Sequence, residues 1–255
     1  MYYLYYDGSF AGFLTAVFDV YELRLKAVAI RKEVLKTDML FTNNQTVIKD
    51  EAKVKRVAAK LENLLGKEGL LHLWAALLSE YDTIEDALLE VVRYALKEQK
   101  NVLSDFGHPA VLEVQQTVRK VHREKHRMLG FVRFQLAKDG IYYAFIEPDF
   151  DILPLIARHF TERFSDQQWL IYDLKRNKGL FYDLKKTELV AATGKDSEKQ
   201  QQLKLRLDPA EEAFQSLWKA YFKHTAIPSR KNTKLHLQFL PKRYWQYLPE
   251  KKPDL

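Results

Sequence analysis

The sequence predicts an α+β protein with a mostly helical N-terminal half and, in its C-terminal half, an antiparallel sheet with flanking helices. Two observations carry this prediction. Apolar residues recur with a helical period through most of residues 46–127, whereas short aromatic or β-branched runs joined by turns follow Gly130. A hydrophobic content of 47% over 255 residues is ample for a packed core. We expect a mainly helical region at 1–128 and an α+β region at 129–255, which form either two domains or one integrated domain.

The N-terminal segment is expected to form a strand, a turn and a helix. Residues 2–6 are an aromatic run that suits a strand, and Asp7-Gly8-Ser9 supplies a turn whose serine can cap a following helix. Apolar positions then recur from Phe10 to Tyr21. Further amphipathic helices are predicted at 46–65, 69–80, 84–99 and 109–127.

Five short runs after Gly130 predict the strands of the sheet. They lie at 131–136, 141–146, 169–173, 179–182 and 189–192, with turns such as Lys138-Asp139-Gly140 between them. This pattern indicates antiparallel hairpins. Amphipathic helices are expected at 152–164 and 209–223, and in the second of these Trp218, Tyr221 and Phe222 have the spacing of residues that pack into a core.

The composition limits the chemistry of the chain. It contains no cysteine, which excludes disulfides, thiolate catalysis and cysteine-ligated zinc or iron–sulfur clusters. Residues 1–10 lack the positive region of a secretory signal, and the longest charge-free apolar stretches are too short to span a bilayer. No Gly-rich nucleotide-binding motif is present. We expect a soluble cytoplasmic protein without a cofactor, a bound metal or membrane contact.

Two segments concentrate the positive charge. Residues 219–252 hold nine Lys or Arg and one acid, residues 116–138 hold seven and one, and the whole chain carries +7, so the rest of it is acidic. This placement indicates an anionic partner at a fixed location. Aromatic residues interleave with the cations of 219–252, which supplies charge for phosphates and flat faces for bases. Nucleic acid is the partner that we expect, and an anionic membrane surface also fits the charge.

Candidate nucleic-acid contacts lie in both segments. Three arginines share one face of the helix predicted at 109–127 with His122 and His126, which favours anion binding over a metal pair; a solvated face is the alternative. The run from Lys242 to Trp245 is either a packed anchor or a ligand contact, with Tyr244 or Trp245 stacking on an unpaired base. The candidates are Arg119, Arg123, Arg127, Arg133, Arg230, Lys231, Lys234, Lys242, Arg243, Tyr244 and Trp245.

Three alternating acids, Glu147, Asp149 and Asp151, follow a predicted strand. They could converge on a divalent metal, with His159 as a further candidate ligand, in a metal-dependent nuclease or nucleotide-processing enzyme. The interpretation that we favour is structural: Asp151 caps the helix that begins near residue 152. No catalytic residue is established by the sequence alone.

Several runs of the sequence together carry a resemblance. They are Tyr5 to Phe10 with Gly12 to Leu14, Arg127 to Phe134, Ile146 to Leu155, His159-Phe160 with Arg163-Phe164, Trp169 to Asp173 and Pro241 to Trp245. On these runs the chain resembles a bacterial family of DNA-metabolism proteins over nearly its entire length. That family has a domain of unknown function that occurs alone or joined to a uracil-DNA-glycosylase-like domain. Its genes lie beside those of a radical-SAM protein proposed to modify or repair DNA.

The resemblance implies a role in DNA repair or modification, with the radical-SAM protein as partner. The chain lacks the Gly-Gln-Asp-Pro-Tyr and His-Pro-Ser motifs of the glycosylase, and without cysteine it cannot hold the radical-SAM iron–sulfur cluster. We therefore expect a DNA-binding accessory protein. The alternatives are the metal-dependent enzyme and a protein-interaction scaffold without DNA contact.

Overall fold

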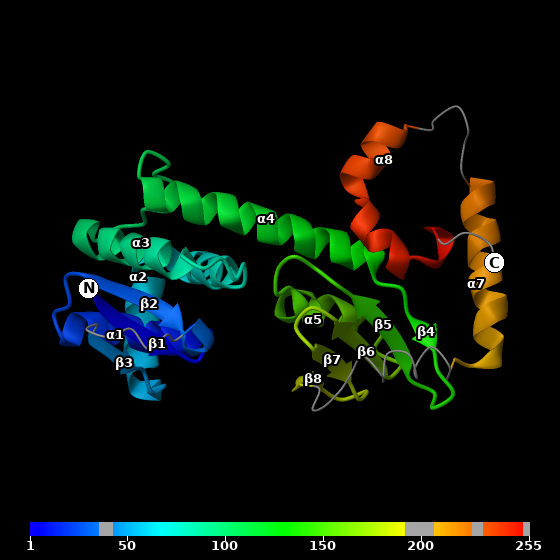
Figure 1. Cartoon of the computed structure of the whole chain (residues 1–255), viewed down its shortest axis with the longest axis horizontal. Helices are drawn as coiled ribbons and strands as arrows, with labels where there is room; N and C mark the ends of the chain where they lie inside the picture. The colour runs from blue at the N-terminus through cyan, green and yellow to red at the C-terminus, as the bar shows by residue number, and fades with distance from the viewer. Residues whose placement is uncertain (36–42, 192–206, 226–231, 252–255) are drawn as a thin grey trace. The chain divides into compact units, whose positions relative to one another are not determined.

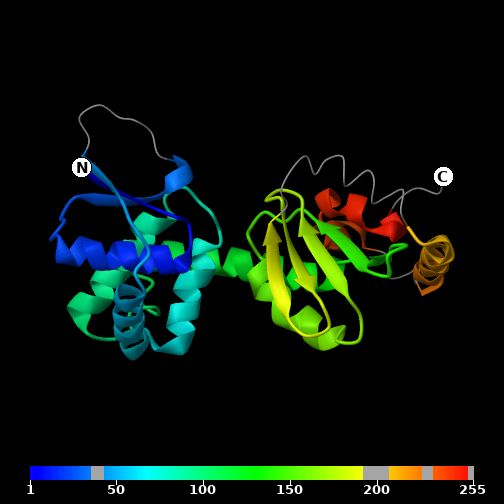
Figure 2. The ribbon, with the colours of Figure 1, turned by 90° about the horizontal axis from the view of Figure 1, so that it is seen from below.

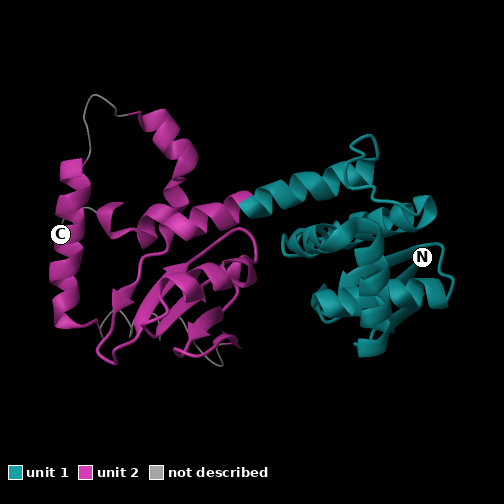
Figure 3. Cartoon of the chain, turned by 180° about the vertical axis from the view of Figure 1, so that it is seen from behind, with its two compact units in different colours: residues 1–122 teal, residues 123–255 magenta. Residues whose placement is uncertain are grey.

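The computed structural model describes residues 1–35, 43–191, 207–225 and 232–251. Figure 1 labels the elements along the chain, and they confirm a mixed α+β protein whose C-terminal half contains a sheet with flanking helices. The chain divides into two compact units, 1–122 and 123–255, shown in different colours in Figure 3. The boundary falls inside helix α4 (Pro109–Phe131), so this helix contributes residues to both units.

Unit 1 contains a three-stranded parallel sheet in the order β2-β1-β3. Its strands are β1 (Tyr2–Tyr6), β2 (Val28–Lys32) and β3 (Asn43–Thr46), and the turn η1 (Glu33–Leu35) follows β2. The predicted start is confirmed: Ser9 caps helix α1 (Phe10–Glu22), and its side chain accepts a hydrogen bond from the Gly12 N–H at 2.9 Å. The prediction missed β2 and β3.

Three helices complete unit 1 together with the first part of α4. They are α1, α2 (Glu51–Leu77) and α3 (Ile84–Glu98). Two helices were predicted where α2 lies, and the structure confirms the division: the backbone of Gly66 is non-helical, with a positive φ of 75° that glycine tolerates. Buried residues such as Phe13, Leu73 and Leu88 join these helices and the central strand in one hydrophobic core.

Helix α4 is longer than predicted, because it continues to Phe131. Gly130 does not end the helix, since it lacks the positive φ that terminates many helices. The strand predicted at 131–136 is correspondingly reduced to β4 (Gln135–Leu136). Along α4, Val111, Val114 and Val118 are buried in the core of unit 1.

Unit 2 contains a five-stranded sheet in the order β4-β5-β6-β7-β8, whose strands run side by side in Figure 2. The longer strands are β5 (Tyr142–Ile146), β6 (Trp169–Asp173), β7 (Lys178–Tyr182) and β8 (Thr187–Ala191). Antiparallel pairing holds for β4–β5, β6–β7 and β7–β8. The β5–β6 pair is parallel, because helix α5 (Leu153–Arg163) returns the chain before β6 begins.

An aromatic cluster fills the core beneath this sheet. Trp169 is 1% exposed, and its ring centroid lies 6.0 Å from that of Phe134, 6.2 Å from Phe160 and 5.5 Å from Tyr182. These residues come from β6, the segment before β4, α5 and β7. The cluster therefore ties α5 to strands that pair with one another.

The expected cap of α5 is wrong. The residue at the N-cap is Ile152, which makes no side-chain cap hydrogen bond, although Pro154 does lie in the first turn. Asp151 instead accepts a hydrogen bond from Lys178 Nζ at 2.5 Å, so its carboxylate joins the loop after β5 to strand β7.

The C-terminal part of unit 2 consists of short helical elements. They are α7 (Pro209–Thr225), α8 (Thr233–Phe239), and the 3-10 helices η3 (Lys242–Tyr247) and η4 (Pro249–Lys251). The predicted helix at 209–223 is confirmed, but the expectation that its aromatic residues pack into a core is wrong. Five side chains, which we call the α7 stripe, are 37% to 68% exposed: Phe214, Leu217, Trp218, Tyr221 and Phe222.

None of the helices in the described part of the chain is long and apolar enough to cross a membrane.

Candidate nucleic-acid interface

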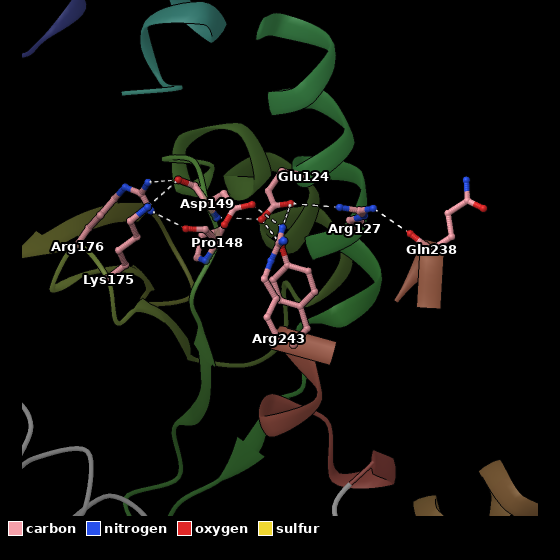
Figure 4. A network of polar contacts seen from close by, with 9 residues as sticks. Glu124, Arg127, Pro148, Asp149, Lys175, Arg176, Gln238 and Arg243 are labelled. Atoms are coloured by element: carbon pink, nitrogen blue, oxygen red, sulfur yellow. Dashed lines mark hydrogen bonds and ion pairs between the residues drawn. The ribbon is translucent and has the colours of Figure 1, made fainter. Parts of the chain in front are cut away.

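The two basic segments, which are far apart in the sequence, meet in unit 2. Arg127 of α4 donates from Nη2 to the carbonyl oxygen of Gln238 in α8 at 3.0 Å. Arg243 of η3 reaches the Glu124 carboxylate of α4, with 3.4 Å between Nη2 and Oε2. Figure 4 shows these contacts as one polar network. We call the region where the end of α4, α8 and η3 meet the α4–η3 surface.

Glu124, the one acid in the basic segment at 116–138, is the centre of this network. Its side chain is 2% exposed. Oε1 accepts hydrogen bonds from the Tyr244 hydroxyl and, at 3.0 Å, from the backbone N–H of Asp149. Arg127 Nη1 lies 3.8 Å from Oε2. A buried carboxylate needs such partners, because the interior does not solvate its charge.

Helix α4 points Glu124 inward through simple periodicity. The buried residues Val121 and Met128 lie three residues before and four residues after it, so all three share one face of the helix. The neighbouring Arg123 is exposed. One turn of helix therefore supplies both the buried acid that holds η3 and a cation that faces solvent.

Arg243 is held between two acids and a ring. Its Nη2 lies 2.5 Å from Asp149 Oδ2, and its guanidinium carbon lies 4.6 Å from the centroid of the Tyr244 ring. The side chain is nevertheless 45% exposed. Arg243 is thus fixed in position while part of it faces solvent.

The structure places Tyr244 in the interior, which excludes it as an open stacking face. Only 2% of it is exposed, and its ring centroid lies 5.4 Å from that of Phe131. Burial, together with the hydrogen bond to Glu124 and its charge, raises the pKa of the Tyr244 hydroxyl above its ordinary value. Tyr244 therefore remains a neutral donor to Glu124 and anchors η3.

Trp245 is half-buried and also has a structural contact. Its indole Nε1 donates to the carbonyl oxygen of Leu240 at 3.1 Å. The centroid of its ring lies 6.2 Å from that of the His236 ring and 5.6 Å from the Lys251 ammonium nitrogen. These contacts join η3 to α8 and η4. The sequence alternatives for this run, anchor or ligand contact, thus divide by residue: the aromatic side chains anchor, and Lys242 is exposed.

Arg133 likewise has an internal role. It pairs with Glu250 at 2.8 Å and lies 5.5 Å from the centroid of the Trp218 ring. Burial opposes ionisation of Glu250, but the hydrogen bonds from Arg133 and from the backbone outweigh it, so the pKa of that carboxyl is lowered. The pair fastens the end of the described chain to the segment after α4.

Three candidate cations of unit 2 face solvent. Arg123, Lys234 and Lys242 are exposed and have no acidic partner among the described residues. Phe239, at the end of α8, is 66% exposed. The exposure of Phe239 has no signal in the sequence, because its spacing is the same for an exposed and for a buried aromatic residue of a short helix.

The other basic candidates lie elsewhere or outside the described residues. Arg119 belongs to unit 1, where its guanidinium carbon lies 5.9 Å from the centroid of the Phe106 ring. Arg230 and Lys231 fall outside the described residues.

The acidic candidates do not converge. Asp149 pairs with Arg243, Asp151 with Lys178, and Glu147 Oε2 accepts a hydrogen bond from the Tyr247 hydroxyl at 2.5 Å. His159 packs edge-on against Phe160, at 5.2 Å between ring centroids. Within the described ranges, no group of three or more metal-binding side chains could hold a metal ion. The geometry gives the metal-dependent enzyme no support.

The loop that carries Asp149 is fastened from its other side by the β6–β7 turn. Lys175 Nζ and Arg176 Nη2 donate to the Asp149 carbonyl oxygen at 3.0 and 2.9 Å. Arg176 also pairs at 2.8 Å with Asp173, whose side chain is fully buried. The sheet therefore holds the loop, and the loop holds Arg243 in place (Figure 4).

Comparison with known proteins adds a family and no activity. A family model described as a domain of unknown function, DUF4130, matches residues 82–250, which is more than half of the chain and includes the whole α4–η3 surface. No curated protein matches the chain.

Proposed function

The chain belongs to the DUF4130 family, and we propose that it is a DNA-binding accessory protein in DNA repair or modification. The observation that carries the proposal is the meeting of two basic segments at the α4–η3 surface. Arg127 and Arg243 offset the charges of Glu124 and Asp149 there. The exposed cations of the same elements are therefore in excess, and they are available to neutralise phosphates.

The proposed phosphate contacts are Arg123, Lys234, Lys242 and the exposed part of Arg243. Hydrogen bonds join α4 to α8 and to η3, so the three elements that carry these cations are held against one another. Phosphate contacts of this kind position a nucleic acid without reading its sequence.

Phe239 takes the stacking role that the sequence suggested for Tyr244 or Trp245. It is an exposed ring on α8, one residue from Gln238, whose carbonyl oxygen accepts from Arg127. Stacking on an aromatic ring needs an unpaired base and contributes about 1–3 kcal/mol per base. We therefore propose a preference for single-stranded DNA.

The double variant Arg123→Ala/Lys242→Ala is expected to bind single-stranded DNA at least tenfold more weakly at low salt. Log affinity falls linearly as log salt concentration rises, and each lost phosphate contact should make this fall shallower by about one unit of slope. Fluorescence anisotropy with a labelled oligonucleotide, titrated at several salt concentrations, measures both quantities. Phe239→Ala should weaken single-stranded binding and leave duplex binding unchanged.

The matched control is Lys185→Ala/Lys186→Ala, which removes two exposed cations from the turn between β7 and β8 in the same unit. It should bind DNA like the wild type. No binding by the wild-type chain at low salt, or equal losses in the two double variants, would refute DNA binding through the α4–η3 surface.

We propose further that the chain acts in the bacterial cytoplasm beside the radical-SAM protein that the resemblance implies. The α7 stripe supports a protein partner, because five large apolar side chains follow one helix face and remain exposed. Exposed apolar patches of this kind mark interaction surfaces. The chain without cysteine would then supply DNA contacts, and the partner would supply the radical chemistry.

Leu217→Ser/Tyr221→Ser is expected to lower affinity for the purified radical-SAM protein by at least tenfold, since central apolar side chains dominate such interfaces. Isothermal titration calorimetry measures the affinity. Leu189→Ser, an exposed leucine of β8, is the matched control. Equal affinities of the stripe variant and the wild type would contradict docking on α7. Concentration-dependent self-association that the stripe variant abolishes would instead show that a second copy covers the stripe.

A further inference from the structure

Helices α1, α2 and α3 of unit 1 border an open groove of about 510 Å³. This volume lies within the roughly 300–1,000 Å³ of sites that bind small molecules. Its apolar lining comes from all three helices: Val17, Phe18 and Tyr21 of α1, Val57 and Leu61 of α2, and Val92 and Leu96 of α3. The lining is therefore mostly apolar, as a hydrocarbon ligand requires.

The charged residues that line the groove carry a net positive charge. Arg56 and Lys60, one helical turn apart on α2, line it together with the acid Glu22. Glu22 is already paired with Lys53 Nζ at 2.7 Å. Neither Arg56 nor Lys60 forms an ion pair with any described acid: Arg56 lies 5.0 Å from the centroid of the Phe18 ring, and Lys60 donates to Gln99 at 2.9 Å. Two positive charges at the α2 edge are therefore uncompensated.

We infer that this groove binds a free fatty acid of medium chain length. The alkyl chain lies along the walls from α1 and α3, and the carboxylate pairs with Arg56 and Lys60 at the edge formed by α2. A fatty acid has an alkyl chain with one terminal carboxylate. Such a ligand matches an apolar groove whose unpaired cations both come from one helix. The few hydrogen-bonding groups of the lining do not suit the polar edge of a nucleobase. This binding site is independent of the DNA contacts proposed for unit 2.

Titration of the full chain with hexanoate, octanoate and decanoate tests the inference by calorimetry. Affinity is expected to rise about fourfold for each added methylene, because each buried methylene contributes about 0.8 kcal/mol. Octanoate should bind at least tenfold more tightly than octanol, which has the same chain length without the charge. Equal affinity for all three acids, or for octanoate and octanol, would overturn the inference.

Variants locate the site. Arg56→Ala/Lys60→Ala should weaken decanoate binding about tenfold and abolish the preference for octanoate over octanol. The matched control, Lys55→Ala/Lys67→Ala, removes two exposed cations of the same helix that do not line the groove, and it should bind like the wild type. Val57→Trp fills the groove. It should prevent binding of decanoate and of octanol, while the circular dichroism spectrum stays unchanged.

The outcomes separate this inference from other occupants and from the proposed function. Decanoate binding that is the same in the charge variant and in its matched control would place the ligand elsewhere. Binding of deoxyadenosine monophosphate without binding of decanoate would assign the groove to nucleotides. Neither result bears on the proposed DNA binding, which is tested separately with Arg123→Ala/Lys242→Ala, because those two residues belong to unit 2.

Discussion

Replacing Glu124 with alanine is expected to lower the free energy of unfolding of unit 2 by about 3–5 kcal/mol, the range for breaking a buried charged network from one side. The substitution leaves the Tyr244 hydroxyl and the Asp149 N–H without their acceptor. It also removes the acid that Arg127 and Arg243 share. Urea unfolding followed by tryptophan fluorescence measures the change, because three of the four tryptophans lie in unit 2.

Glu113→Ala is the matched control for this prediction. Glu113 lies on the same helix, is exposed and belongs to unit 1, so its loss should change the free energy of unfolding by less than about 0.5 kcal/mol. A second test is the double variant Glu124→Ala/Tyr244→Phe, which removes the stranded hydroxyl and should recover part of the loss. A loss below about 1 kcal/mol in Glu124→Ala would show that the carboxylate does not organise the surface.

Replacing Trp169 with alanine should cost about 3–5 kcal/mol of unfolding free energy, as expected when a buried indole is deleted and the cavity cannot close. Its neighbours Phe134, Phe160 and Tyr182 belong to three different segments, which limits their collapse into the space. Urea unfolding followed by circular dichroism at 222 nm measures the change, since the substitution removes a fluorophore.

Trp218→Ala makes the same chemical change at a half-exposed position of the α7 stripe and should cost less than about 1.5 kcal/mol. Comparable losses in the two tryptophan variants would mean that the α7 stripe is covered in solution. That result would count against the docking surface proposed on α7.

Much of the fold could be predicted where one period runs through a complete element. The strand at residues 2–6, the cap at Ser9 and the helices α3 and α5 all carry their own signal. Strand β3 could not be predicted, because its sequence Asn-Asn-Gln-Thr is polar, its four residues are exposed, and it is defined by its pairing with β1. The parallel pairing of β5 with β6 is likewise a tertiary property.

The sequence predicts the two basic segments of the candidate site, but it does not predict the structural role of each residue within them. Charge counts identify both basic segments, yet they cannot show that Arg127, Arg133 and Arg243 are held by internal contacts. The central role of Glu124 did have a signal: it falls on the apolar face defined by Val121 and Met128. An acid at such a position predicts a buried partner, although the sequence does not say which residue supplies it.

Helix α4 is a single helix whose residues belong to both units, so its stability depends on both hydrophobic cores. Its i to i−4 backbone hydrogen bonds continue across residues 122 and 123, where the units divide. Because helix formation is cooperative, we expect unwinding that starts in one unit's part of α4 to extend into the other unit's part. A destabilising substitution in either unit is therefore expected to reduce the protection of α4 amides from hydrogen exchange on both sides of residue 122.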